Sequence, residues 1–227
     1  QAPQKGDVIR LPTLAKTLRA ISEGGRDAFY KGQIAEEIAR FVQAEGGWLS
    51  YEDLANHTSN WEEPIVTDYR GVKVWECPPS GQGLIALMAL NIAEGWDLRT
   101  MGFQSPDTYH HLIECFRLAV ADGFHYIGDP SVADVPTEML LSKSYAQQRR
   151  ALVQQDEAIS SLTFGTMQTL HDTVYVTCVD SDGNACSFMN SVFSAFGTGL
   201  VVPGTGIALH DRAALFSLDP NHVNALA

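Results

Sequence analysis

A run of hydroxyl side chains near the end of the chain has the residue types that nucleophilic catalysis uses. It comprises Thr173, Thr177, Ser187, Ser191 and Ser194. A threonine or serine hydroxyl is a poor nucleophile unless a neighbouring group takes its proton. Threonine is also common in β-strands, because its branched side chain fits the pleated surface. The residue types alone therefore leave two interpretations of Thr173, a nucleophile or an ordinary half-exposed strand residue.

Two other clusters carry side chains of metal-binding type: His110-His111 with Glu114, and Asp122, Asp129 and Asp134. Adjacent histidines on a helix point in different directions, and no third ligand lies at a supporting spacing. The aspartates lack the ligand spacing and closing glutamate of an EF-hand. The glycine segments 197–199 and 203–206 lack the lysine of a P-loop and the GxGxxG pattern. We therefore expect neither a metal nor a cofactor, and we interpret these glycines as tight turns between strands.

The composition excludes several classes of protein. The chain has 15 Lys and Arg against 27 Asp and Glu, which gives a formal net charge of -12. With no basic cluster it has little surface that could neutralise phosphates. The longest apolar stretch, residues 84–90, is too short to span a bilayer. We therefore expect a folded protein with no nucleic-acid partner and no membrane span in this piece.

The cysteines and the first residues say little about compartment. The four cysteines show no CxxC spacing, and we expect all of them to be buried thiols: Cys77, Cys115, Cys178 and Cys186. The first six residues have neither the charged start nor the apolar run of a signal peptide. The localisation is therefore not indicated by the sequence.

The elements that position the hydroxyl run follow from the periodicity. Helical spacing predicts one helix over 11–21 that ends at Gly24-Gly25 and a second over about 34–42. Further predictions are a short helix from Ser50 to Asn56, a hairpin over 64–69 and 72–76, and helices over 84–95 and 105–122. Strand-like segments 173–179 and 185–193 flank a turn at Asp182-Gly183. The chain is thus predicted to be α+β, with a helical region followed by a β-hairpin region.

The segments Asp172-Thr173-Val174-Tyr175-Val176-Thr177 and 179–185 resemble the start of the small subunit of γ-glutamyltranspeptidases. The match continues in the family's order through 196–199, 203–207 and Phe216-Ser217. Upstream, segments 29–32, 69–71, 78–81 and 128–130 resemble the second half of the large subunit. The resemblance covers nearly the whole chain. It implies part of the layered αββα fold of N-terminal-nucleophile hydrolases, with residues 1–172 a mainly helical large-subunit portion and 173–227 a β-rich small-subunit portion.

The resemblance implies that the precursor cuts itself immediately before Thr173. The threonine then has a free α-amino group that can act as its base. By the family pattern a second hydroxyl residue on the returning strand hydrogen-bonds the nucleophile, and Ser191 occupies that position. A two-residue turn would set Thr173 opposite Val192. Bringing Ser191 to the nucleophile therefore requires a longer turn or a bulge.

Differences from the family pattern concern the substrate. Family members that bind a γ-glutamyl group use asparagine, glutamine and aspartate where this chain has Phe193, Arg212 and Leu215. An arginine pairs with a carboxylate and cannot neutralise an ammonium ion. We therefore assign Arg212 and Phe193 to substrate binding, and we expect γ-glutamyl or related carboxyacyl amides as substrates.

The family pattern also places functional parts outside these residues. An arginine for the substrate carboxylate would precede Gln1, and the oxyanion-hole glycines would follow Ala227. We therefore expect this piece to be inactive without the remaining parts of its own precursor. The alternative is a non-catalytic, uncleaved relative whose hydroxyls are structural, and cleavage at Asp172-Thr173 separates the two hypotheses.

Overall fold

The computed structural model describes residues 3–162 and 173–226. The chain forms two compact units, each built from two stretches of sequence. Unit 1 comprises Gln1–Asn60 and Leu170–Ala214, and unit 2 comprises Trp61–Thr169 and Leu215–Ala227. This division differs from the predicted boundary at Thr173. That boundary concerns processing of the chain, and it stays a prediction.

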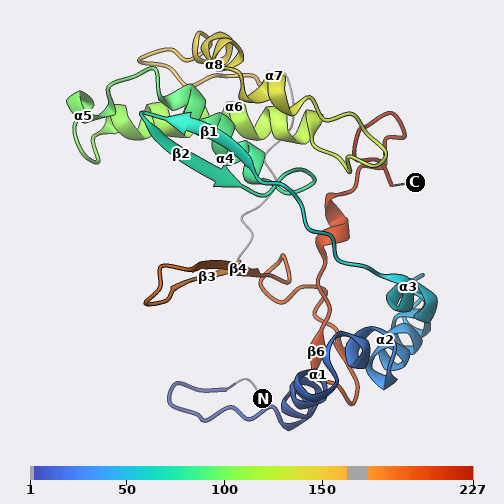
Figure 1. The fold of residues 1–227 in the computed structure, drawn as a ribbon. Coiled ribbons are helices and arrows are strands. Elements are labelled where there is room, and N and C mark those ends of the chain that lie inside the picture. Colours follow the sequence, from blue (N-terminus) through green and yellow to red (C-terminus); the bar gives the residue numbers. More distant parts are fainter. Residues whose placement is uncertain (1–2, 163–172, 227) are drawn as a thin grey trace. The chain divides into compact units, whose positions relative to one another are not determined.

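Unit 1 combines helices from the start of the chain with short strands from its last third (Figure 1). The elements are α1 (Pro12–Tyr30), α2 (Gln33–Ala44), α3 (Tyr51–Asn56), β3 (Val174–Val179), β4 (Ala185–Asn190), β5 (Val201–Val202) and β6 (Ile207–Ala208). Its core lies where Ile34 and Ile38 of α2 pack against Val202 of β5. Thr17, a buried residue of α1, donates its hydroxyl to Thr205 O over 2.8 Å. The N-terminal helices therefore support the turn between β5 and β6.

Most helix ends in unit 1 follow the predicted signals. Ser50 and Asp53 form the expected capping box at α3, in which each side chain accepts from the other residue's backbone N–H. The first helix is longer than predicted, because it resumes after Gly24-Gly25 and ends at Tyr30. Gly25 has a φ of 63° and a ψ of −152°, which breaks the helical path. The glycine pair thus marks a kink rather than an end.

Unit 2 combines a helical layer with the predicted hairpin of β1 (Ile65–Tyr69) and β2 (Val72–Glu76). Its helices are α4 (Gly83–Ala93), α5 (Leu98–Met101), α6 (Pro106–Tyr126), α7 (Thr137–Leu141) and α8 (Lys143–Arg150). The long helix α6 packs along α4, with Leu84, Met88 and Leu118 buried between them (Figure 1). Helices α5, α7 and α8 were not predicted, because they are short or lie in strongly polar sequence.

A buried carboxylate on α6 fixes the segment that follows α8. Glu114 is 1% exposed, and its Oε1 accepts from Arg117 Nη1 over 2.6 Å. Its Oε2 accepts from Ile159 N–H at 3.4 Å, while Arg117 Nη2 donates to Ile159 O over 3.0 Å. Both backbone groups of Ile159 are therefore bound by one ion pair, which satisfies a buried charge that would otherwise be costly.

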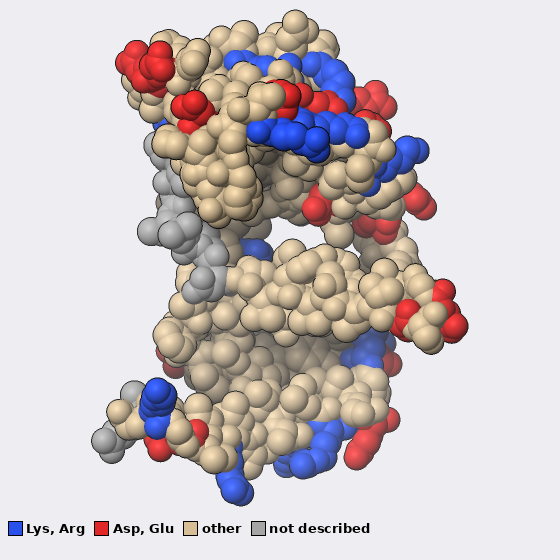
Figure 2. Space-filling model, turned by 90° about the vertical axis from the view of Figure 1, so that its left-hand side faces the viewer, with Lys and Arg blue, Asp and Glu red and all other residues tan. Residues whose placement is uncertain are grey.

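The surface carries both signs of charge. On the face drawn in Figure 2, Lys and Arg side chains lie among Asp and Glu side chains. Among the described helices, none is both long enough and apolar enough to cross a bilayer.

Candidate active site

The loop that joins β3 to β4 contains three residues, 181–183. It is closed by Asp180, whose N–H donates to Asn184 O over 3.0 Å. The Asp180 carboxylate accepts from Asp182 N–H at 3.0 Å and from Asn184 N–H and Nδ2 at 2.8 Å each. Hydrogen bonds from Asn184 are the main reason that the pKa of Asp180 lies below its ordinary value. Gly183 has a φ of 84°, a conformation that glycine adopts without steric penalty.

This loop sets the register of the hairpin that carries Thr173. The strands are antiparallel, and Val174 lies opposite Asn190 at the end of the ladder. The next position along the register places Thr173 opposite Ser191. A two-residue turn would have placed Val192 there, on a register shifted by one residue. Of the longer turn and the bulge that the family pattern left open, the longer turn is the one present.

The Ser191 hydroxyl is the point where the predicted site residues meet. Thr173 Oγ1 donates to Ser191 Oγ over 3.1 Å. Ser191 Oγ also accepts from Phe193 N–H at 3.0 Å and from Arg212 Nη2 at 2.9 Å. Thr173 is exposed and Ser191 is half-buried. All four residues that we predicted for the site thus lie together within unit 1.

Phe193 and Arg212 contact each other on one side of this cluster. The Arg212 guanidinium carbon lies 5.1 Å from the centroid of the Phe193 ring, within the range of a cation–π contact. Phe193 is 6% exposed and has a φ of 76°. Arg212 is exposed, so a positive charge faces solvent beside the threonine hydroxyl.

Asp211 holds the two halves of the cluster together, and the sequence did not single it out. Its carboxylate accepts from Ser194 N–H at 3.0 Å, and its own N–H donates to Val192 O over 3.3 Å. These bonds tie the backbone after Ser191 to the backbone before Arg212. The sequence contained no signal for this role, because an aspartate between strands is common in turns.

The glycine segments form tight turns, as predicted. Gly197 has a φ of 55°, and a Cβ added there would lie 2.3 Å from Leu209 O. The adjacent Thr198 N–H donates to Leu209 O over 2.9 Å. Glycine is therefore required at 197 for both its conformation and the close approach of a second backbone.

The prediction that all cysteines are buried is wrong for three of the four. Cys115 on α6 is 1% exposed, and burial raises the pKa of its thiol to about 12. Cys77 follows β2 and is exposed. Cys178 and Cys186 lie opposite each other on β3 and β4, whose residues are all exposed. Strand periodicity indicates which residues share a face, but not whether that face is covered.

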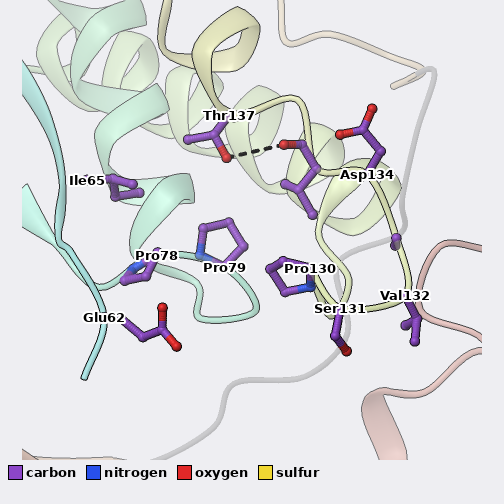
Figure 3. Close-up of a pocket in the computed structure, with 11 residues that line it drawn as sticks. Glu62, Ile65, Pro78, Pro79, Pro130, Ser131, Val132, Asp134 and Thr137 are labelled. Atoms are coloured by element: carbon purple, nitrogen blue, oxygen red, sulfur yellow. Dashed lines mark hydrogen bonds between the residues drawn. The ribbon is translucent and has the colours of Figure 1, made fainter. Parts of the chain in front are cut away.

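A pocket of about 640 Å³ lies in unit 2 (Figure 3). It is lined by Glu62, Ile65, Pro78, Pro79, Pro130, Ser131, Val132, Ala133, Asp134, Val135 and Thr137. The Thr137 hydroxyl in its wall donates to Val135 O over 3.4 Å. None of these lining residues is a predicted site residue, and we assign the pocket no function.

The histidines considered as metal ligands have other partners. His110 Nε2 lies 2.7 Å from Gln154 O, and His111 Nδ1 lies 2.8 Å from Asp107 O. Within residues 3–162 and 173–226, no group of three or more His, Cys, Asp or Glu side chains is placed to hold a metal ion.

The fold matches that of N-terminal-nucleophile hydrolases of the acylase and transpeptidase type. The sequence profile described as "Gamma-glutamyltranspeptidase" matches residues 1–227, and the chain belongs to this family. The cephalosporin acylase from Bacillus halodurans is similar in structure, with a TM-score of 0.87 and 45% identity over 100% of this chain and 41% of that one.

Curated relatives give the same family. The glutathione hydrolase-like YwrD proenzyme of Bacillus subtilis (strain 168) is 36% identical over 100% of this chain and 42% of its own length. The glutathione hydrolase proenzyme of Escherichia coli (strain K12) is 37% identical over 97% of this chain and 39% of its own length. The chain thus spans about two fifths of the length of these relatives.

Proposed function

We propose that Thr173 becomes an N-terminal nucleophile when the precursor cuts the Asp172–Thr173 bond. Asp172 lies outside the described residues. In this step Thr173 Oγ1 attacks the Asp172 carbonyl carbon and the C–N bond breaks, which leaves an ester and a free α-amino group on Thr173. Water then opens the ester, releasing the Asp172 carboxylate and restoring the threonine hydroxyl.

After cleavage the α-amino group of Thr173 serves as the base. Its ordinary pKa of about 7.7–8.0 leaves a substantial neutral fraction near neutral pH. It takes the hydroxyl proton as Oγ1 attacks an amide carbon of the substrate, and it passes that proton to the leaving amine. The acyl group is then held as an ester on Thr173. Water completes a hydrolysis, whereas a second amine completes an acyl transfer.

The substrate that this site favours is a small amide whose acyl chain ends in a carboxylate. Arg212 supplies an exposed cation that contacts the same Ser191 hydroxyl as the nucleophile does. Its guanidinium lies over the ring of Phe193. A guanidinium pairs well with a carboxylate and repels an ammonium group. This favours glutaryl-type and related carboxyacyl amides over γ-glutamyl amides. The remaining parts of the precursor are the partners that complete the site, and the chemistry needs no cofactor.

The observation that carries the proposal is the 3.1 Å contact between Thr173 Oγ1 and Ser191 Oγ. It is tested on the full-length precursor by intact mass and N-terminal sequencing. We expect a second N-terminus beginning Thr173-Val174-Tyr175 in the wild type and in a Thr177→Ala control, and a single uncleaved species in Thr173→Ala. The 227-residue piece alone is expected to stay uncleaved and inactive. A full-length wild type that stays uncut would instead support a non-catalytic relative.

The substrate class is tested separately, by comparing glutaryl and γ-glutamyl anilides with the processed enzyme. We expect higher kcat/KM for the glutaryl compound and a rise in its KM in Arg212→Met. Better turnover of the γ-glutamyl compound would contradict the role of Arg212 while leaving Thr173 as the nucleophile.

A further inference from the structure

The Ser191 oxygen receives more hydrogen bonds than it can accept at full strength. Three donors lie within 3.1 Å of it: Phe193 N–H at 3.0 Å, Arg212 Nη2 at 2.9 Å and Thr173 Oγ1 at 3.1 Å. A hydroxyl oxygen has two lone pairs and one hydrogen of its own. One of the three contacts must therefore be weak or reversible.

The three donors differ in what else they can do. A backbone N–H and a guanidinium can only donate, and neither has an accepting atom. The threonine hydroxyl both donates and accepts. The Thr173–Ser191 contact is therefore the one whose direction can reverse, because the other two donors already occupy both lone pairs of Ser191.

We propose that Arg212 is a positioning residue for the nucleophile, acting through Ser191. With both lone pairs of Ser191 occupied, its own hydrogen is left to point at Thr173 Oγ1. Because a cation in a chain of hydrogen bonds polarises the next one, Arg212 makes Ser191 a stronger donor. The inference rests on the proposed function, and it adds a role for Arg212 that does not involve contact with substrate.

The proton movements of the attack are consistent with this direction. As Oγ1 bonds to the substrate carbon, the Thr173 proton passes to the α-amino group and the C–O π electrons move to the carbonyl oxygen. Ser191 keeps its hydrogen covalently and donates it to Oγ1 while that atom carries partial negative charge. A donor directed at developing charge stabilises the transition state more than the ground state.

The test is a double-mutant cycle on the full-length enzyme with an acyl anilide that lacks a carboxylate. Such a substrate cannot pair with Arg212, so any effect of the arginine must act through the protein. We expect Arg212→Met to lower kcat about 10- to 100-fold, the range for loss of a charge-assisted hydrogen bond. In a Ser191→Ala background the same change should alter kcat by less than about 3-fold. Arg212→Lys should recover part of the loss, and Arg19→Met, at an exposed site on α1, should match the wild type.

Equal losses in the two backgrounds would overturn the inference, as would an effect confined to KM. Variants that process too slowly for steady-state kinetics are compared by their rate of self-cleavage, followed by intact mass. The same hydroxyl attacks in that step, so the same non-additivity is expected. Different results would contradict the proposed function itself: a wild type with no N-terminus at Thr173, or a Thr173→Ala variant that keeps full activity.

Discussion

At Phe193 a glycine variant should be more stable than an alanine variant, which is the reverse of the usual order. The side chain is 6% exposed, so truncating it to alanine is expected to destabilise the protein by about 3–5 kcal/mol. Its φ of 76° adds a penalty of roughly 1–2 kcal/mol for any residue with a Cβ. Glycine removes that penalty, but its greater freedom in the unfolded chain lowers the stability of the protein by about 0.5–1 kcal/mol. Taking the midpoints of these two ranges, Phe193→Gly should be more stable than Phe193→Ala by about 0.5–1 kcal/mol.

The comparison is made by thermal and urea unfolding of the two variants side by side. For a chain of this size the difference corresponds to about 1–4 °C in Tm. Phe196 is a matched control, since it is 83% exposed and is not among the non-glycine residues with positive φ. There alanine should be the more stable of the two. If Phe193→Ala equals or exceeds Phe193→Gly, the backbone conformation assigned to the site is wrong.

Three further results are expected. Asp180→Ala should speed amide exchange in the loop and slow self-cleavage, because a two-residue turn then competes, while Ser181→Ala should do neither. Hydrogen bonds lower the pKa of Asp180 in the folded chain. The contribution of its carboxylate to the stability of the loop is therefore complete above pH ~4 and is lost as the pH falls through the lower pKa of the folded chain. Amide exchange measured at pH 2–5 should show this loss. Alkylation of the native chain should spare Cys115, and mass spectrometry should find label on the exposed thiols of Cys77, Cys178 and Cys186. Glu114→Gln should increase proteolysis around Ile159, and unchanged digestion would exclude the anchoring role of this carboxylate.

The sequence predicted those elements whose causes are local. The α3 capping box and the β1–β2 hairpin depend on residues within a few positions of each other. The longer turn between β3 and β4 was expected only because the family pattern requires Ser191 next to Thr173. The resumption of α1 after Gly25 was missed, because its continuation depends on packing against α2. The exposure of Cys77, Cys178 and Cys186 was also missed, since it depends on which faces are covered.

The site was predicted only in part from the residues. The resemblance brought Thr173, Ser191, Phe193 and Arg212 together, whereas spacing alone left Thr173 indistinguishable from a strand residue. The contact of Arg212 with Ser191 spans 21 positions, and no local pattern indicates it. The same holds for the positive φ of Phe193, because side chains with a Cβ rarely adopt it without support from tertiary contacts.

Each compact unit is built from two stretches of sequence, and this arrangement has a consequence for a chain that has been cleaved. A cut before Thr173 would leave two polypeptides, and each would contribute to both units. In unit 1, Ile38 packs with Val202 across the cut; in unit 2, Gly128 is in contact with Val223 across it. Separating the two pieces would therefore require the core of unit 1 to open and the backbone contact at Gly128 in unit 2 to break. Breaking a single peptide bond would create a new chain end while the product stays one particle.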